Sequence, residues 1–315
     1  MPNSTPDLDL DLGDLAEGDW VARLDALGEE HGFFEQLGQS HLSLFVESGP
    51  LLLVSFESLE GARRAPGALP RGLDQVTRNH WSVLTILSRG DTWFRDPAVW
   101  RHFDRLTDDG FFEDFRSVLF VGAGPGGYAA AAFSIAAPGA RVLAMRPYAT
   151  LDPSIAGWDR RHLNQRRLDW TSRYGYAPDS LDGVDRAWVV HDPLHVPDAM
   201  HAALFHRPNV TTLRCRLTGT RLDTMLDSVQ ALPRLLDMAM DGTLDTRGFA
   251  RLWRERRRHS PYLRLLLKRL ETEGRRDLAL RLCRYGLGTV DRPLFARKLL
   301  ELENPHRAAG TAAAE

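Results

Sequence analysis

Cysteine is scarce in this chain, and long hydrophobic runs are absent. The 315 residues include two cysteines, Cys215 and Cys283, which lie far apart and outside any C-x-x-C pattern. The sequence therefore indicates neither a disulfide framework nor a cysteine zinc site, and we expect both thiols to be small buried side chains. No apolar run reaches the roughly 18 residues of a membrane-spanning helix, and the N-terminus is acidic where a signal peptide is basic. These features predict a cytoplasmic protein with no membrane partner.

Net charge is also small, at −2, but it is unevenly spread. Residues 1–30 carry nine acidic side chains and one basic side chain, and residues 247–276 carry eleven basic side chains and three acidic ones. The two segments could attract each other, or each could form a solvated surface, which we favour. The basic run 254–259 has few aromatic residues nearby, so we predict a solvated helix face and no nucleic-acid partner.

The order of apolar patterns predicts an α/β fold with an α/β-hydrolase-like, mostly parallel sheet in three αβα layers and a C-terminal helical appendage. A helix is expected over residues 20–37, and Glu47–Pro50 carries the turn residues of a hairpin. Asp96 and Pro97 predict the start of a helix, with Asp96 as its cap and Pro97 as its first helical residue. The strands are expected at residues 41–46, 51–56, 81–87, 118–121, 141–145, 186–190 and 210–217.

The same patterns predict the domain organisation. We expect an acidic disordered tail at 1–18, an α/β-hydrolase-like domain at 19–240, a helical appendage at 241–305 and a disordered tail at 306–315. Within the main domain, residues 152–180 form an insertion at the place where a hydrolase carries its cap.

The glycine-rich turn Gly122–Gly127 follows an apolar strand and precedes an Ala-rich helix. In a dinucleotide fold, the spacing G-x-G-x-x-G lets the backbone approach a pyrophosphate. That fingerprint also needs an acidic residue after the second strand, where this chain has Arg146, a side chain that could instead meet a 2′-phosphate. In an α/β-hydrolase, the same turn is the nucleophile elbow G-x-S-x-G, and the nucleophile position is then Gly124.

The other triad positions can be assigned by their order along the chain. Asp192 follows the strand 186–190 and takes the place of the acid, and Arg221 lies after the strand 210–217, where the histidine is expected. Glycine cannot form an acyl-enzyme, and arginine cannot act as a base near neutral pH. We therefore expect no catalytic residue but a surviving pocket for an anion or a carbonyl group. Its candidate residues are Gly122, Gly124, Pro125, Gly126, Gly127, Glu57, Ser58, Asp192 and Arg221.

Histidine and aspartate are concentrated in residues 191–206. The spacing fits no standard metal motif, and His201 and His206 do not share one helical face. We expect solvated or capping roles for these side chains, and neither a metal nor a cofactor.

The chain resembles an alphaproteobacterial family whose members are named phosphoadenosine phosphosulfate reductase. The resemblance runs from about Asp19 to Glu303 through the motifs VARLDALGEE, GDTWFRDPAVW, FFEDF, GAGPGGYAAAAFS, RYGYAPD, DAMHAALF and LRCR. It implies a sulfonucleotide reductase with a C-terminal Glu-Cys-Gly nucleophile. Cys283 lies in Leu-Cys-Arg and Cys215 in Arg-Cys-Arg, so no catalytic residue is carried over.

Three functions remain open on the sequence. The first is a non-catalytic protein of hydrolase fold that binds a small ligand or a protein partner. The second is a sulfonucleotide reductase, and the third is an oxidoreductase that binds FAD or NAD(P) at the glycine turn.

Overall fold

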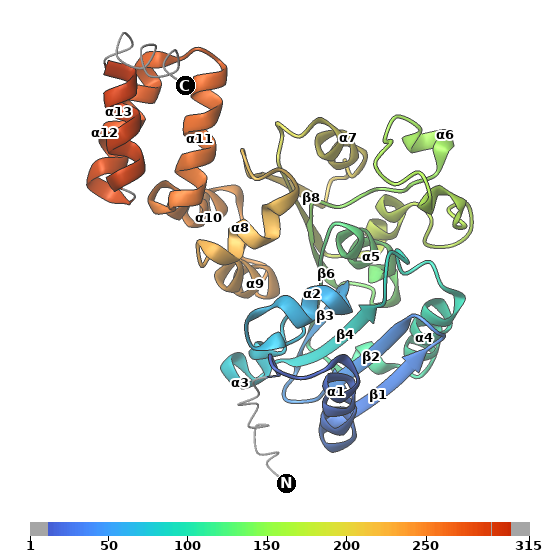
Figure 1. Cartoon of the computed structure of the whole chain (residues 1–315). Coiled ribbons are helices and arrows are strands. Elements are labelled where there is room, and N and C mark those ends of the chain that lie inside the picture. Colours follow the sequence, from blue (N-terminus) through green and yellow to red (C-terminus); the bar gives the residue numbers. More distant parts are fainter. Residues whose placement is uncertain (1–11, 291, 304–315) are drawn as a thin grey trace.

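A single eight-stranded sheet organises the molecule (Figure 1). The structure is a computed structural model that describes residues 12–290 and 292–303. The strands are β1 (Gly32–Leu37), β2 (His41–Val46), β3 (Leu51–Ser58), β4 (Ser82–Ser88), β5 (Ser117–Ala123), β6 (Arg141–Met145), β7 (Arg186–His191) and β8 (Val210–Arg214). Their spatial order is β1-β2-β4-β3-β5-β6-β7-β8, in which the β1–β2 and β2–β4 pairs are antiparallel and the other pairs are parallel. This order, antiparallel at one end and parallel across the rest, is α/β-hydrolase-like and confirms the predicted fold class.

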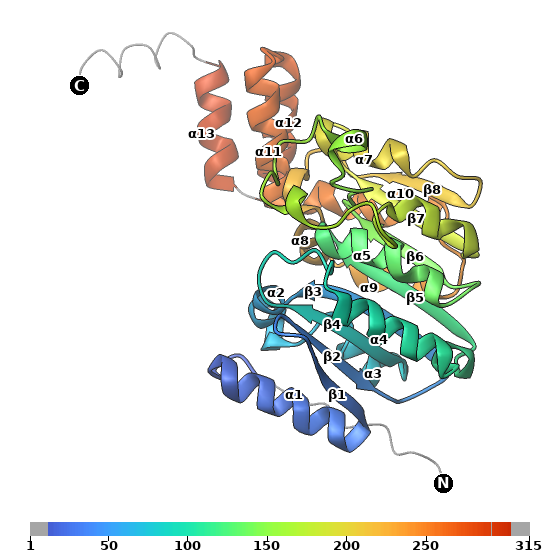
Figure 2. The same ribbon diagram turned by 90° about the vertical axis from the view of Figure 1, so that its right-hand side faces the viewer.

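Helices cover both faces of the sheet, as Figure 2 shows. They are α1 (Glu17–His31), α2 (Leu59–Arg64), α3 (Asp74–Asn79), α4 (Pro97–Asp108), α5 (Pro125–Phe133), α6 (Pro153–Ala156), α7 (Val196–Leu204), α8 (Leu222–Ser228), α9 (Leu232–Met240), α10 (Thr246–Leu252), α11 (Ser260–Thr272), α12 (Arg276–Thr289) and α13 (Arg292–Glu303). One buried apolar cluster joins the sheet to α1 and to α8–α12, and a second joins it to α4, α5 and α7. The three layers follow from these two clusters.

The start of α4 agrees with the sequence signal. The Asp96 carboxylate accepts a hydrogen bond from the Ala98 backbone at 2.8 Å, and Pro97 is the first helical residue. Val99 and Phe103 then point into the core. A cap, a proline and an apolar stripe thus act together, as predicted.

The predicted hairpin is wrong. β2 and β3 form at the expected residues, but β4 lies between them and pairs with both. The Ser82 hydroxyl group accepts hydrogen bonds from the Ser48 and Gly49 backbone N–H groups at 2.9 and 3.2 Å. The turn residues therefore hold the chain against the start of β4 instead of joining two neighbouring strands.

Two predictions near the N-terminus also need correction. The helix expected over residues 20–37 ends at His31, and residues 32–37 are the edge strand β1, which pairs with β2. Residues 12–18, expected to be part of a disordered tail, contain the buried Leu12, whose backbone N–H donates to the Gly67 carbonyl oxygen at 2.9 Å. The predicted tails at residues 1–11 and 306–315 lie outside the described residues.

The C-terminal segment is helical, as predicted, and α8 and α9 precede it. α11–α13 extend away from the sheet in Figure 1. Within the described ranges, no helix is both long and apolar enough to cross a membrane.

Candidate functional site

The turn after β5 has the backbone geometry of a nucleophile elbow. Gly124 lies between β5 and α5 with φ of 59° and ψ of −121°, a conformation that glycine adopts without strain. Its N–H donates to the Met145 carbonyl oxygen at 2.9 Å, and its carbonyl oxygen accepts from the Tyr128 N–H at 3.0 Å. The residue at the nucleophile position is thus fixed by the sheet on one side and by α5 on the other.

The neighbouring glycines are required by close packing. A Cβ atom at Gly122 would lie 2.1 Å from the Gly126 carbonyl oxygen, and one at Gly126 would lie 2.2 Å from the Phe56 carbonyl oxygen. At Gly127 the Met145 carbonyl oxygen would be 2.9 Å away. These three glycines let α5 start directly against the ends of β3, β5 and β6.

Arg146 lies over the elbow. A Cβ atom at Gly124 would be 2.9 Å from Nη2 of Arg146, so the guanidinium group occupies the space of a nucleophile side chain. Arg146 has φ of 49°, and its backbone N–H donates to the Val190 carbonyl oxygen at 2.6 Å. Its Nε atom is buried without a hydrogen-bond partner, and its guanidinium group forms no ion pair with any described residue. From the sequence we expected a role for Arg146 only in the dinucleotide alternative, because its approach to Gly124 depends on the path of the chain after β6.

The oxyanion side of the elbow also differs from that of a hydrolase. In a hydrolase, the residue after the nucleophile donates its backbone N–H to the oxyanion, but here that residue is Pro125, which has no N–H. From the loop after β3, the Ser58 hydroxyl group accepts from the Gly61 N–H at 3.0 Å and caps α2. The Glu57 carboxylate accepts from the Arg71 N–H, and burial raises the pKa of Glu57. Both side chains thus support local structure.

Asp192 follows β7, at the predicted position of the acid, and it is buried. Its Oδ1 accepts from the Leu194 N–H at 2.9 Å, and its Oδ2 accepts from the Gly219 N–H at 2.8 Å. The structure therefore brings Asp192 and the loop after β8 together, but the contact is made by the backbone of that loop. Arg221 is exposed at the end of the 3₁₀ segment Gly219–Arg221, and it has no ion pair with Asp192.

A buried polar network anchors the insertion 152–180, and the sequence did not predict it. His201 Nδ1 accepts a hydrogen bond from the Ala149 N–H at 3.2 Å, so the proton of the neutral imidazole is on Nε2. Nε2 lies 3.0 Å from Asp159 Oδ2 and donates a hydrogen bond to it. Arg161 bridges Asp159 and Asp198 at 2.7 and 2.6 Å. The solvated or capping role expected for His201 is wrong, because α7 turns this side chain under the insertion, where it is fully buried.

The pKa values of this network follow from its contacts. Burial alone would raise the pKa of Asp159, but hydrogen bonds from His201 and Arg161 outweigh it and hold that pKa well below its usual range. Burial lowers the pKa of His201 despite the neighbouring carboxylate. Among the described residues, no cluster of three or more His, Cys, Asp or Glu side chains is arranged to hold a metal ion.

A second polar cluster resembles a triad, but its serine and histidine are closed to solvent. The Ser43 hydroxyl group lies 2.9 Å from His102 Nε2, and Glu35 lies 3.4 Å from His102 Nδ1. Arg105 also contacts Nδ1, at 3.1 Å, and because arginine only donates, this contact leaves the proton on Nε2. Ser43 and His102 are both buried. The imidazole in this tautomer donates to Ser43 and cannot remove its proton.

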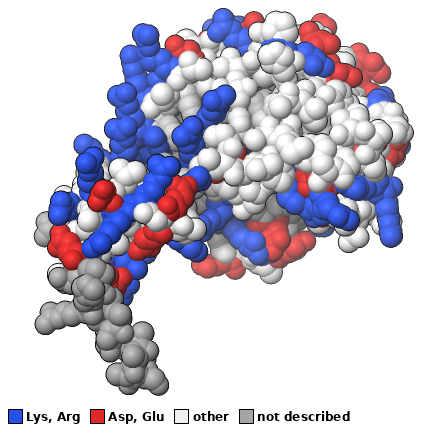
Figure 3. Space-filling view, turned by 90° about the horizontal axis from the view of Figure 1, so that it is seen from above, with Lys and Arg blue, Asp and Glu red and all other residues white. Residues whose placement is uncertain are grey.

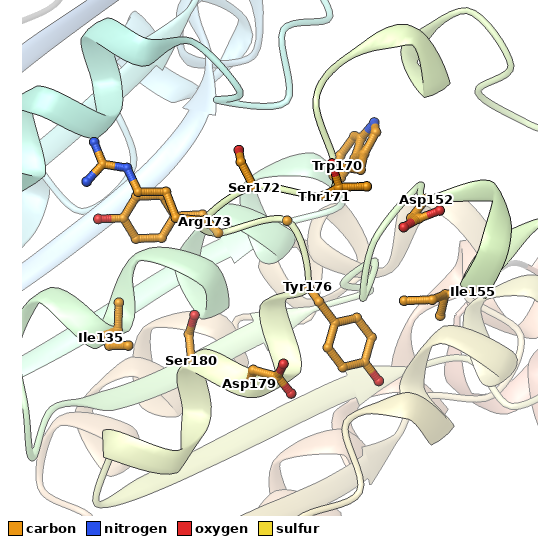
Figure 4. A pocket seen from close by; sticks show the side chains of 12 residues that line it. Ile135, Asp152, Ile155, Trp170, Thr171, Ser172, Arg173, Tyr176, Asp179 and Ser180 are labelled. Carbon is orange, nitrogen blue, oxygen red and sulfur yellow. The ribbon is translucent and has the colours of Figure 1, made fainter.

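A cavity lies against the insertion and apart from the elbow. It has a volume of about 600 Å³. Figure 4 shows its lining, in which Trp170, Tyr176, Asp152 and Ile155 lie towards one side of the view and Arg173 towards the other. None of the elbow residues contributes to it. The sequence indicated an insertion here but not its aromatic lining.

No protein-family model and no curated protein sequence matches the chain. Solved structures with a similar fold include Est1E from Butyrivibrio proteoclasticus, with 14% identity, a TM-score of 0.41, and coverage of 65% of this chain and 97% of that one. A putative esterase from Staphylococcus aureus has 12% identity and a TM-score of 0.41, covering 74% and 95%. The capsule O-acetyltransferase of Neisseria meningitidis serogroup A has 11% identity and a TM-score of 0.39, covering 65% and 93%.

With identities of 14% or less and TM-scores below 0.5, these likenesses support no conclusion about the activity of this chain. The name phosphoadenosine phosphosulfate reductase gains no support from these comparisons, and neither does an oxidoreductase that binds FAD or NAD(P).

Proposed function

We propose that this protein is a non-catalytic member of the α/β-hydrolase-like fold that binds a small anion, through a carboxylate or phosphate group, at the position of the lost nucleophile. The observation that carries the proposal is the guanidinium group of Arg146 over Gly124, 2.9 Å from where a nucleophile's Cβ atom would be. A cation in this position favours an anionic ligand.

The nucleophile and the oxyanion donor of a hydrolase are missing at the elbow, and the carboxylate at the acid position has another partner. Gly124 offers no nucleophile, and Pro125 offers no N–H for an oxyanion. Asp192, which would orient a histidine, instead accepts the backbone N–H of Gly219. In serine hydrolases, loss of the nucleophile or the base lowers kcat by about 10⁶-fold. These replacements therefore support binding without turnover.

The charge around Arg146 supports anion binding. Its guanidinium group has no carboxylate partner in the described part of the chain, and its Nε atom is buried without a partner. The helix α5 begins beside it at Pro125, and a helix N-terminus favours negative charge. A carboxylate or phosphate group on Arg146 would form two charge-assisted hydrogen bonds in a fork geometry.

The test is thermal unfolding of the protein with millimolar phosphate, acetate, succinate or citrate at constant ionic strength. We expect at least one of them to raise the melting temperature by several degrees, because a ligand at 100 times its Kd stabilises by about 2.7 kcal/mol. Arg146→Gln should abolish the rise. Arg101→Gln, a change at an exposed arginine of α4 that forms no ion pair with a described residue, should leave the rise intact.

Two results would contradict the proposal. One is a melting temperature that no anion changes, and the other is an equal rise in the Arg146 variant. A yellow preparation with bound flavin, or stabilisation by NAD or NADP instead of simple anions, would favour the dinucleotide alternative.

A further inference from the structure

A cleft of about 550 Å³ lies between β8, the last strand in the order of the sheet, and the segment that begins with α10. Its lining comes from β8, from α10 and from the 3₁₀ segment Trp253–Arg258 that follows α10. None of the elbow residues lines it. Its residues are Thr212, Leu213, Arg214, Thr246, Phe249, Ala250, Trp253, Arg254, Arg256 and Arg257.

One side of this cleft is a free strand edge. β8 pairs only with β7 in the sheet, through contacts such as Ala187 N–H to Asn209 O at 3.0 Å and Cys215 N–H to His191 O at 2.8 Å. In a parallel ladder with this phase, the N–H and C=O groups of Thr212 and Arg214 point away from β7. Neither residue forms another backbone hydrogen bond within the described ranges, and both are exposed. This edge can accept one more strand.

The other side of the cleft is basic. Arg214, Arg254 and Arg257 are exposed, and none of them forms an ion pair with a described residue. Arg256 lies over the Trp253 ring at 5.3 Å and donates to the Trp253 carbonyl oxygen, and it likewise forms no ion pair with a described residue. Figure 3 shows lysine and arginine side chains gathered on the side of the molecule that carries the C-terminal helices.

The floor of the cleft is apolar but closed to base stacking. Leu213, Phe249 and Trp253 are 1%, 4% and 4% exposed, so neither ring offers a face on which a nucleic-acid base could stack. In an extended segment alternate side chains point to opposite faces, so acidic residues at every second position would all face the arginines.

We propose that this cleft binds an acidic segment of a partner protein, which adds to the edge of β8 in an extended conformation. Backbone hydrogen bonds to Thr212 and Arg214 give the register, and carboxylates of the segment pair with Arg254 and Arg257. The site is separate from the elbow, so the failure of either proposal leaves the other standing.

The probe is a fluorescein-labelled ten-residue peptide of alternating aspartate and valine, titrated with the full chain and followed by fluorescence anisotropy. We expect saturable binding that weakens from 50 to 300 mM NaCl. The double variant R254E/R257E should bind at least tenfold more weakly. The matched control R234E/R281E makes the same change in net charge at two exposed arginines outside the cleft that form no ion pair with a described residue. It should bind within twofold of the wild type.

A second peptide tests the strand edge itself. It has proline in place of every second valine, which keeps the aspartates but removes N–H groups that a strand partner needs. We expect at least tenfold weaker binding of this peptide. Circular dichroism checks that each variant is folded, and Arg214→Glu provides an independent change on β8.

Several outcomes would overturn the proposal. Equal binding of the proline peptide would mean that charge alone attracts it. Tighter binding of a ten-nucleotide oligothymidine, or of vesicles with anionic phospholipid, would assign the basic surface to a different partner. Absence of peptide binding at 50 mM NaCl would mean that the arginines only keep the edge of β8 from pairing.

Discussion

Asp192 Oδ2 accepts a hydrogen bond from the Gly219 backbone N–H at 2.8 Å. The carboxylate at the acid position of the fold therefore holds the loop after β8, where a hydrolase has its histidine. In a hydrolase this carboxylate would serve catalysis. In this protein it stabilises the loop, and its contribution can be measured as a free energy of unfolding.

Asp192→Ala should destabilise the protein because the N–H groups of Leu194 and Gly219 both lose their acceptor. Each unsatisfied group near the buried Asp192 position costs about 1–3 kcal/mol. The measurement is the free energy of unfolding in urea. Asp182→Ala is the control, because the Asp182 side chain is 71% exposed and its ion pair with Arg207 contributes little. Equal stability of the two variants would contradict the structural role of Asp192.

Gly124→Ser should lower stability by about 1–3 kcal/mol, because a non-glycine residue must adopt positive φ and its side chain meets Arg146. We also expect no reaction with a fluorophosphonate probe, since no base activates the introduced hydroxyl group. Gly124→Ser/Arg146→Gly should recover part of the stability, because it removes the contact and the positive φ of Arg146 suits glycine. Labelling of the introduced serine, detected by in-gel fluorescence, would show that a base is present.

Gly122→Ala should destabilise the protein by at least about 3 kcal/mol, because the new methyl group would lie 2.1 Å from a backbone oxygen of Gly126. Gly18→Ala provides the comparison, since a Cβ atom there has no neighbour within 4 Å. Alanine also suits a helix better than glycine, so this second variant should melt at the same or a slightly higher temperature. If both variants melt alike, the close approach of β5 and α5 is not as described.

Stability should fall as the pH decreases from about 6.5 towards 4. Burial lowers the pKa of His41 and of His102 to about 4, so the folded protein keeps these side chains neutral while the unfolded chain binds protons below pH 6.5. Each histidine then removes up to roughly 3 kcal/mol of stability at the acidic end of this range. Asp159, with its pKa held below the usual range, loses its contribution only at a more acidic pH.

Urea unfolding at pH 7.5, 5.5 and 4.5 measures this dependence. His41→Gln and His102→Gln should each flatten the pH profile, and His206→Gln, at an exposed position, should not. A profile that none of the three variants changes would rule out these two histidines as its source.

Both thiols should resist modification in the folded protein. Cys215 and Cys283 are buried, and burial raises the pKa of each. We expect Ellman's reagent to react with neither thiol in buffer and with both in guanidinium chloride. Replacement of both by alanine should leave thioredoxin-dependent reduction of sulfonucleotide at background, and turnover that disappears in the Cys283 variant would instead support the reductase alternative.

Local signals in the sequence determined much of the fold and one part of the site. Alternating and continuous apolar runs predicted seven of the strands, and Asp96 with Pro97 predicted the start of α4, because these signals act between residues close in the chain. The glycine turn identified the elbow and the absence of a nucleophile at Gly124, since this fact needs only the residue type at one position. Burial of both cysteines was also predicted correctly.

Only the tertiary structure decided which segments meet. The order β2-β4-β3 replaced the hairpin because strand pairing depends on contacts between distant segments, which turn residues do not specify. Arg146, after β6, reaches Gly124 of the elbow, and Asp159 of the insertion reaches His201 on α7. Neither contact has a local signal in the sequence. The free edge of β8 is visible only once the sheet is complete, because a strand at the end of a sheet has no local sequence that distinguishes it from a central one.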